Sequence, residues 1–324
     1  MSGWPFTGKD AFPPRPKYAN ARSNKFVDYA AQPQGQRTRW WRFSSLTPIR
    51  DRAIFPPMHL TPRQTLATPS PRHWLALPAL LFFFTHAVRA QDNYEIQVYG
   101  SETEAPGSTM LELHSNFTGD GSHEIVNGVL PSNRAEHETL EITHGWTPWF
   151  ETGFYVFSSL QPGQGWNWVG DHLRPRVRIP ESWNWPVGLS LSVEAGYQRP
   201  SYCEDTWNLE LRPIIDKKIG PWYFAVNPAL EKSLHGYGAP EGWGFSPAAK
   251  ISYDVTKIVT VGVEYYADLG PITHFSNYTD QQHQIFPALD LNFSPQWEFN
   301  CGFGFGLTHS SDNLLFKMIL GRHF

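Results

Sequence analysis

The sequence predicts an all-β fold, an antiparallel up-and-down transmembrane β-barrel of about twelve strands, and two observations support it. From Thr109 onward, segments of about ten residues alternate apolar and polar side chains, and tight turns alternate with longer polar loops between them. The chain then closes with one more alternating segment, Leu314 to Phe324, which stops on an aromatic residue. A soluble β-sandwich is the alternative fold.

The expected strands are even in number, as a closed up-and-down barrel requires. They begin near Thr109, Ala135, Pro148, Val169, Asn184, Tyr202, Gly220, Gly242, Lys257, Gln281, Gln296 and Asn313. Residues 93–100 are ambiguous, because they fit either a further strand or a periplasmic stub.

The faces of the strands are clearest between Val187 and Tyr197. Odd positions there are apolar or aromatic, whereas even positions are glycine, serine or glutamate. Because successive side chains of a strand point to opposite faces, one face suits lipid and the other a polar lumen.

Tryptophans mark one rim of the expected barrel. They lie at the short turns, where the amphipathic indole ring favours the membrane surface: Trp146, Trp149, Trp183, Trp185, Trp222 and Trp297. With both chain ends in the periplasm, the short turns fall on that side and the long loops outside.

The first 90 residues differ from the rest of the chain. An apolar run from Trp74 to Phe84 leads into Ala87-Val88-Arg89-Ala90, which predicts a signal peptide over 58–90, cleaved after Ala90. A transmembrane helix is the alternative, but this run is well short of the ~20 residues needed to cross a bilayer. Residues 1–57 are a disordered extension or an overlong start, and residues 91–324 form the barrel.

The terminal strand resembles the assembly signal of bacterial outer-membrane barrels, although Arg322 departs from its apolar pattern. This resemblance covers residues 91–324 in architecture. It is greatest for small porin-like and hydrophobic-compound transporter barrels, and it implies a Gram-negative outer membrane. The implied partners are outer-membrane lipid and lipopolysaccharide, and the barrel-assembly machinery through the strand ending at Phe324.

Charge separates the two parts of the chain. Residues 1–90 hold 13 basic and 3 acidic side chains, so residues 91–324 hold 13 basic and 27 acidic ones. This acidic balance argues against nucleic acid as a partner.

One row of charges is the main candidate for function. Arg174, Arg176 and Arg178 share the lumen-facing parity with His172. The expected neighbouring strands add further inward charges: Glu151, Glu194, Glu210 and Arg212. Such rows either line a narrow pore that selects by charge or neutralise one another and close the lumen. Low-specificity passage of small solutes, with the arginine row as selectivity element, is the leading function, and a closed structural or interaction barrel is the alternative.

Other chemistry is weakly indicated. The run from Ala135 to His144 is rich in Glu and His but contains no H-E-x-x-H, so neither a metal nor another cofactor is expected. His309 and Ser311 invite comparison with the outer-membrane phospholipase, but both fall in a predicted hairpin, so lipid hydrolysis ranks third and an enzyme is not expected. Trp166 and Trp168 lie in an expected loop, as ligand contacts or as an outer aromatic girdle.

Overall fold

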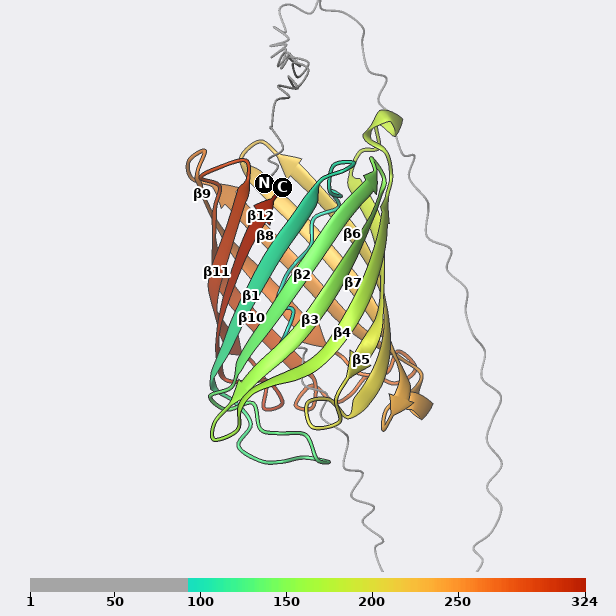
Figure 1. Ribbon diagram of the computed structural model, residues 1–324, viewed down its shortest axis with the longest axis vertical. Coiled ribbons are helices and arrows are strands. Elements are labelled where there is room, and N and C mark those ends of the chain that lie inside the picture. The colour runs from blue at the N-terminus through green and yellow to red at the C-terminus, as the bar shows by residue number, and fades with distance from the viewer. Residues whose placement is uncertain (1–92) are drawn as a thin grey trace, which may run out of the picture. The chain divides into compact units, whose positions relative to one another are not determined.

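Twelve antiparallel strands form a closed barrel in the computed structural model, which describes residues 93–324 (Figure 1). The predicted fold class and strand number are therefore confirmed, and this is the architecture of an outer-membrane barrel. The expected extension at 1–57, the signal peptide at 58–90 and its cleavage after Ala90 lie outside the described residues.

Each strand pairs with its neighbour in sequence, and β1 pairs with β12 to close the barrel. The first six strands are β1 (Thr109–Asp120), β2 (Glu136–Thr147), β3 (Phe150–Gln161), β4 (Gly165–Arg178), β5 (Gly188–Gln198) and β6 (Asp205–Ile219). The second six are β7 (Trp222–Gly236), β8 (Trp243–Asp254), β9 (Val259–Asp268), β10 (Gln282–Leu291), β11 (Trp297–Gly306) and β12 (Leu314–His323). Two short 3-10 helices, η1 (Glu181–Trp183) and η2 (Ala239–Glu241), lie in connections.

One predicted loop is wrong. The glycine-rich stretch around Trp166 and Trp168 belongs to β4, which pairs with β3 as far as Gly165 opposite Gln161. A register shift beside Phe157 lets the hairpin continue, so the connection is a tight turn. Both indoles are about half exposed on the strand itself.

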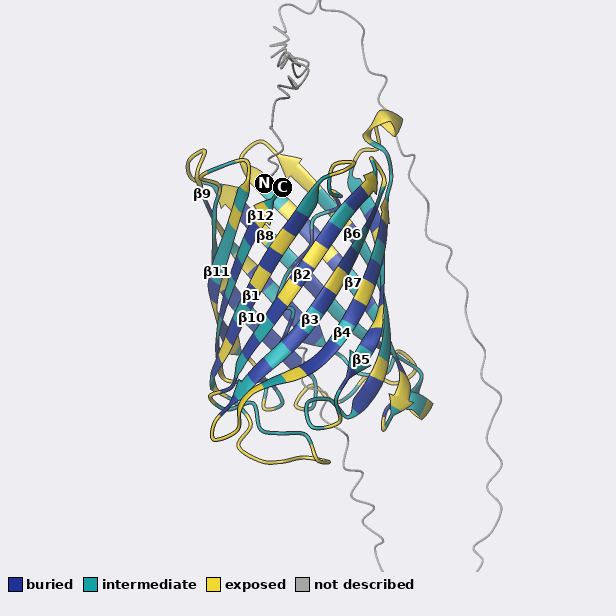
Figure 2. Cartoon of the chain, in the orientation of Figure 1, coloured by how far each residue is buried: buried dark blue, intermediate teal, exposed yellow. Residues whose placement is uncertain are grey.

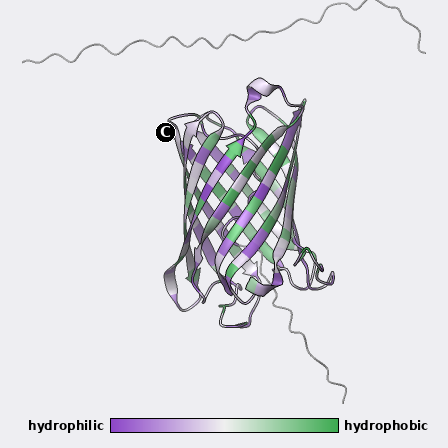
Figure 3. Ribbon diagram, turned by 90° about the vertical axis from the view of Figure 1, so that its right-hand side faces the viewer, coloured by the Kyte–Doolittle hydropathy of each residue, from purple (hydrophilic) through white to green (hydrophobic). Residues whose placement is uncertain are grey.

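Burial alternates along most of the strands, as the sequence pattern predicts, and most regularly along β1, β2 and β5 (Figure 2). Leu140 and Leu173 are exposed on the outside, whereas Thr139 and Arg174 beside them are buried in the lumen. Hydropathy alternates in the same way along the strands (Figure 3). Among residues 93–324, no helix is long and apolar enough to cross a membrane.

The six tryptophans expected at the short turns all lie at that end of the barrel. Five of them are exposed, with Trp183 at 63% and Trp146 at 58%. The opposite end, which carries the longer β1–β2 and β9–β10 connections, is called the long-loop end below (Figure 1).

Residues 93–104 are neither a strand nor a periplasmic stub, and we call them the lumen segment. They take no place in the strand order and run through the barrel interior, where they contact buried side chains of the wall. Asn93 bonds Asp312 in the β11–β12 connection at the long-loop end, whereas Glu104 contacts His323 at the short-turn end. Phe324 lies at the short-turn end as expected, but the described chain starts at the opposite end.

Leu140→Arg tests which face meets lipid. Leu140 lies near the middle of β2 and is 42% exposed, so the charge would enter the apolar band and lower the free energy of unfolding by about 2–4 kcal/mol. Urea unfolding from lipid vesicles, followed by tryptophan fluorescence, measures this. Ile219→Arg, at the end of β6, is the control and is expected to lower it by about 0–1 kcal/mol. Equal effects at both positions would contradict the assignment.

Candidate functional site: the barrel lumen

Wall side chains hold the lumen segment by its backbone. Asn227 of β7 accepts from the Tyr99 N–H at 2.7 Å and donates to the Tyr99 carbonyl at 3.0 Å. Lys317 of β12 donates to the Ile96 carbonyl at 3.0 Å. An extended segment outside the sheet has no ladder partners, so side chains must satisfy its buried backbone groups.

The same pattern continues along the segment at both of its ends. Thr139 donates to the Tyr94 carbonyl at 2.8 Å, near the long-loop end. Asp216 accepts from the Ser101 hydroxyl at 2.6 Å, and Glu151 accepts from the Glu104 N–H at 2.6 Å. Contacts from β2, β3, β6, β7 and β12 therefore fix the segment across the lumen.

Arg174 and Arg176 lie inside the barrel, as predicted, and both are paired. Arg174 contacts Glu141 at 2.5 Å and Glu151 at 3.0 Å, and Arg176 contacts Glu151 at 2.6 Å. All four side chains are more than 90% buried. Tyr155 also accepts a hydrogen bond from Arg174. The row is thus neutralised by acids of the two preceding strands.

Tyr99 of the lumen segment sits among three guanidinium groups. The Cζ atoms of Arg174, Arg176 and Arg212 lie 5.4, 5.8 and 5.1 Å from its ring centroid. Cations over an aromatic face at this distance are attracted by the ring quadrupole. Arg176 also donates to the Gly100 carbonyl at 3.2 Å. The arginines therefore contact the lumen segment as well as the acids of the wall.

The remaining predicted residues form ion pairs that do not involve Glu141 or Glu151. Arg178 pairs with the exposed Glu181 at the short-turn end, 3.1 Å away. Glu194 contacts His172 at 2.6 Å, and Arg212 binds both oxygens of Glu210 at 2.5 and 2.6 Å.

A second network was not identified from the sequence. Lys317, fully buried, pairs with Glu264 of β9, which also contacts Lys250 at 3.1 Å. Lys250 in turn pairs with Asp290 at 2.9 Å. The alternation along β12 places Lys317 on the inward face. Its partners, however, lie on strands that are distant in sequence, so a local pattern does not identify them.

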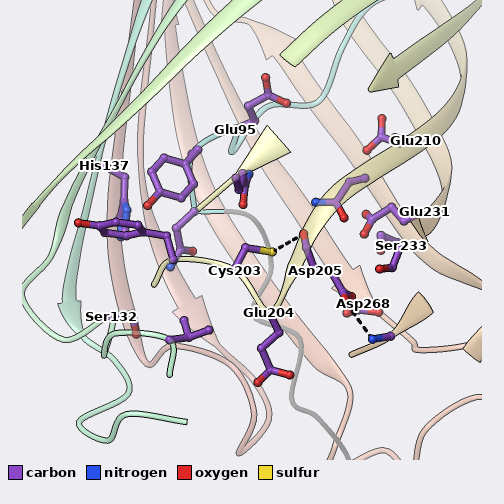
Figure 4. Close-up of a pocket in the computed structure, with 18 of the residues that line it drawn as sticks. Glu95, Ser132, His137, Cys203, Glu204, Asp205, Glu210, Glu231, Ser233 and Asp268 are labelled. Atoms are coloured by element: carbon purple, nitrogen blue, oxygen red, sulfur yellow. Dashed lines mark hydrogen bonds between the residues drawn. The ribbon is translucent and has the colours of Figure 1, made fainter. Parts of the chain in front are cut away.

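An acidic cavity lies between the lumen segment and the long-loop end (Figure 4). Its volume is about 320 Å³, and we call it the vestibule. Its basic residues are Arg212 and Lys232. Its acidic residues are Glu95, Glu124, Glu194, Glu204, Asp205, Glu210, Glu231, Asp268 and Asp312.

Three vestibule glutamates stand side by side on adjacent strands. Glu194 of β5 is opposite Glu210 of β6, which is opposite Glu231 of β7. Glu194 and Glu210 have basic partners, but among residues 93–324 Glu231 has none within 4.0 Å. Such a row attracts positive charge.

Ser311, one of the two residues compared with a lipase pair, has other partners. Ser311 is buried in the β11–β12 connection, where it donates to the His283 carbonyl at 2.9 Å and accepts from its N–H at 2.8 Å. These bonds brace the connection against β10. Trp166 and Trp168 lie at the outer rim on β4, in positions that suit an aromatic girdle.

No protein-family model and no curated protein sequence matches this chain. Among solved structures, the barrel is similar to a KdgM porin, with 12% identity and a TM-score of 0.44, over 66% of this chain and 99% of that chain. A NanC porin shows 8% identity and a TM-score of 0.45, over 65% and 97%. The translocator domain of autotransporter NalP from Neisseria meningitidis shows 10% and 0.40, over 68% and 89%. All three TM-scores lie below 0.5.

Glu151→Gln tests the arginine cluster. The change removes the carboxylate shared by Arg174 and Arg176 and leaves buried guanidinium charge without a counterion, so the free energy of unfolding is expected to fall by about 3–5 kcal/mol. Urea unfolding from vesicles measures it. Glu181→Gln removes an exposed partner and is expected to change it by about 0–1 kcal/mol. A loss at Glu151 as small as at Glu181 would show that these pairs do not stabilise the barrel.

Proposed function

We propose that this protein is an outer-membrane channel for small solutes, preferring cations, whose lumen is closed at rest by the lumen segment. The observation that carries the proposal is that residues 93–104 fill a polar lumen without joining the strand order. The barrel closes through β1 and β12, so moving the segment breaks no bond of the wall.

Opening exchanges hydrogen bonds for water. The segment is held by side chains such as Asn227, Asp216 and Lys317, all of which face the lumen. In a flooded lumen, water replaces these bonds, so the net loss per bond is far smaller than for a bond broken in lipid. In the open state Arg174 and Arg176 would face the path and act on passing ions.

Cation preference follows from the vestibule. Solutes from the long-loop end meet nine carboxylates and only two Lys or Arg side chains there. Acidic rings raise the local concentration of cations and reject anions. Selection of ions would therefore begin in the vestibule, before a solute reaches Arg174 and Arg176.

A closed structural barrel is the competing function. The pairing of Arg174 and Arg176 with Glu141 and Glu151 favours it, because paired charges inside a narrow lumen leave no free ions to select a solute. The two functions differ in whether the lumen segment ever moves.

The proposed location is the outer membrane of a Gram-negative bacterium, after removal of a signal peptide behind Ala90. The apolar outer face and the tryptophan rim support a membrane location. The strand ending at Phe324 would engage the barrel-assembly machinery, and lipid and lipopolysaccharide would surround the barrel.

A disulfide tether tests the gate. Ser101→Cys with Asp216→Cys, at two side chains 2.6 Å apart, would lock the segment to β6 in a barrel freed of native thiols by Cys203→Ala and Cys301→Ala. In planar bilayers, the oxidised barrel is expected to give no conductance steps. Reduction is expected to restore them.

The barrel with Cys203→Ala and Cys301→Ala alone is the control, and its conductance should not respond to redox. Conductance steps from the oxidised, tethered barrel would show that ions cross while the segment is locked in place, and would overturn the gate. If neither the reduced, inserted barrel nor the control gives conductance steps, the result would favour the closed structural barrel.

Glu204→Gln tests cation preference. Glu204 lines the vestibule from the β5–β6 connection, and loss of its charge is expected to lower the cation-to-anion permeability ratio about twofold, because the local potential becomes less negative. Reversal potentials in a salt gradient measure the ratio. Glu138→Gln, which removes an acid hydrogen-bonded to Ser115 outside the vestibule, should leave it unchanged. An unchanged ratio in Glu204→Gln would remove the vestibule from the mechanism.

A further inference from the structure

Glu112, His114 and Glu141 form a compact cluster deep in the lumen. Glu112 and His114 lie two positions apart on β1, and Glu141 of β2 is opposite Glu112 in the register. One ligand atom from each residue falls within 4.8 Å of the others. The side chains are 6%, 0% and 1% exposed. No other group of three or more His, Cys, Asp or Glu side chains within residues 93–324 meets the same geometry.

The cluster contains buried polar atoms without hydrogen bonds. Neither ring nitrogen of His114 has a hydrogen-bond partner, and neither has Oε2 of Glu141, which lies 3.4 Å from His114 Nε2. Buried polar atoms are nearly always satisfied in native proteins, so an unsatisfied group of this kind indicates a missing partner. A ligand placed between these atoms would supply one.

The surroundings orient Glu141 toward that position. Its Oε1 accepts from Arg174 at 2.5 Å and from Thr143 at 2.7 Å. These bonds leave Oε2 directed at His114. Outer contacts that fix a ligand's orientation in this way are typical of metal sites. Glu112 has no basic partner within 4.0 Å among the described residues, so a bound cation would be the charge partner that this buried carboxyl group lacks.

We propose that Glu112, His114 and Glu141 bind one divalent transition-metal ion, with zinc or manganese as the expected occupants. One imidazole nitrogen and two carboxylate oxygens are suitable donors for both, and water would complete the coordination. The ion would join β1 to β2 beside the contact between Arg174 and Tyr99. Because the three residues come from two strands, no single sequence motif predicts the site.

This inference is independent of the channel proposal. A metal tie between β1 and β2 would stabilise the barrel whether or not the lumen segment moves, because an ion that binds only the folded state raises its stability. The competing explanation is a protonated His114 that pairs with Glu141 and needs no ion.

The experiment uses the full mature chain, untagged, refolded in detergent after chelator treatment, with Zn²⁺, Mn²⁺ or Co²⁺ added during refolding because the site is buried. We expect one equivalent of Zn²⁺ to remain after gel filtration, and visible absorption bands from Co²⁺. The midpoint of thermal unfolding should rise with added Zn²⁺.

His114→Gln and Glu112→Gln are expected to weaken Zn²⁺ binding at least tenfold. The matched control is His137→Gln, since His137 is also a buried lumen histidine whose ring nitrogens have no hydrogen bond but lies outside the cluster. It should bind Zn²⁺ as the parent does. Absence of bound metal in the parent, or equal binding by His114→Gln, would overturn the proposal.

X-ray absorption on the zinc-loaded parent gives a result that does not depend on how the variants fold. A first shell of one imidazole nitrogen with oxygen donors is expected. A shell of several imidazoles would place the ion on surface histidines and overturn the proposal.

Discussion

The hydrocarbon core of a membrane offers no water to backbone amides and carbonyls, and this constraint determines the rest of the structure. Each strand must pair on both sides, so the sheet has to close, here between β1 and β12. Closure divides the side chains of every strand into a lipid set and a lumen set. Charged side chains of the spanning strands have only the lumen to enter, and the lumen becomes crowded with ions that need partners.

Two kinds of partner satisfy that need. Acids of neighbouring strands neutralise the arginines, as Glu151 does for Arg174 and Arg176. The lumen segment supplies the second kind, because its carbonyls accept from wall donors such as Lys317. The dependence is mutual, since the segment's backbone would otherwise be buried without bonds. A polar wall and an extended inner segment therefore stabilise each other without any strand pairing.

The sequence predicts the wall well and the interior poorly, for one physical reason. A period of two is local, so the faces of β5 and the inward side of Arg174 follow from neighbouring residues alone. The contacts of the lumen segment are not local. Asn227 and Tyr99 form a hydrogen bond although they are 128 positions apart in sequence, and no local pattern near either residue predicts the contact. The same limit hides the vestibule, whose acids come from many strands and loops.

Displacing the lumen segment requires less free energy than separating two strands of the wall. Separating two strands would expose a row of amides and carbonyls to lipid, where each unsatisfied group costs several kcal/mol. Withdrawing the segment exposes Asn227, Asp216 and Lys317 to a space that water can enter, so each lost bond is replaced. The apolar contacts of Ile96 and Val98 in one cluster, and of Tyr94 in another, are lost without replacement. A barrel built under the membrane constraint is therefore rigid in its wall and most easily changed in its lumen.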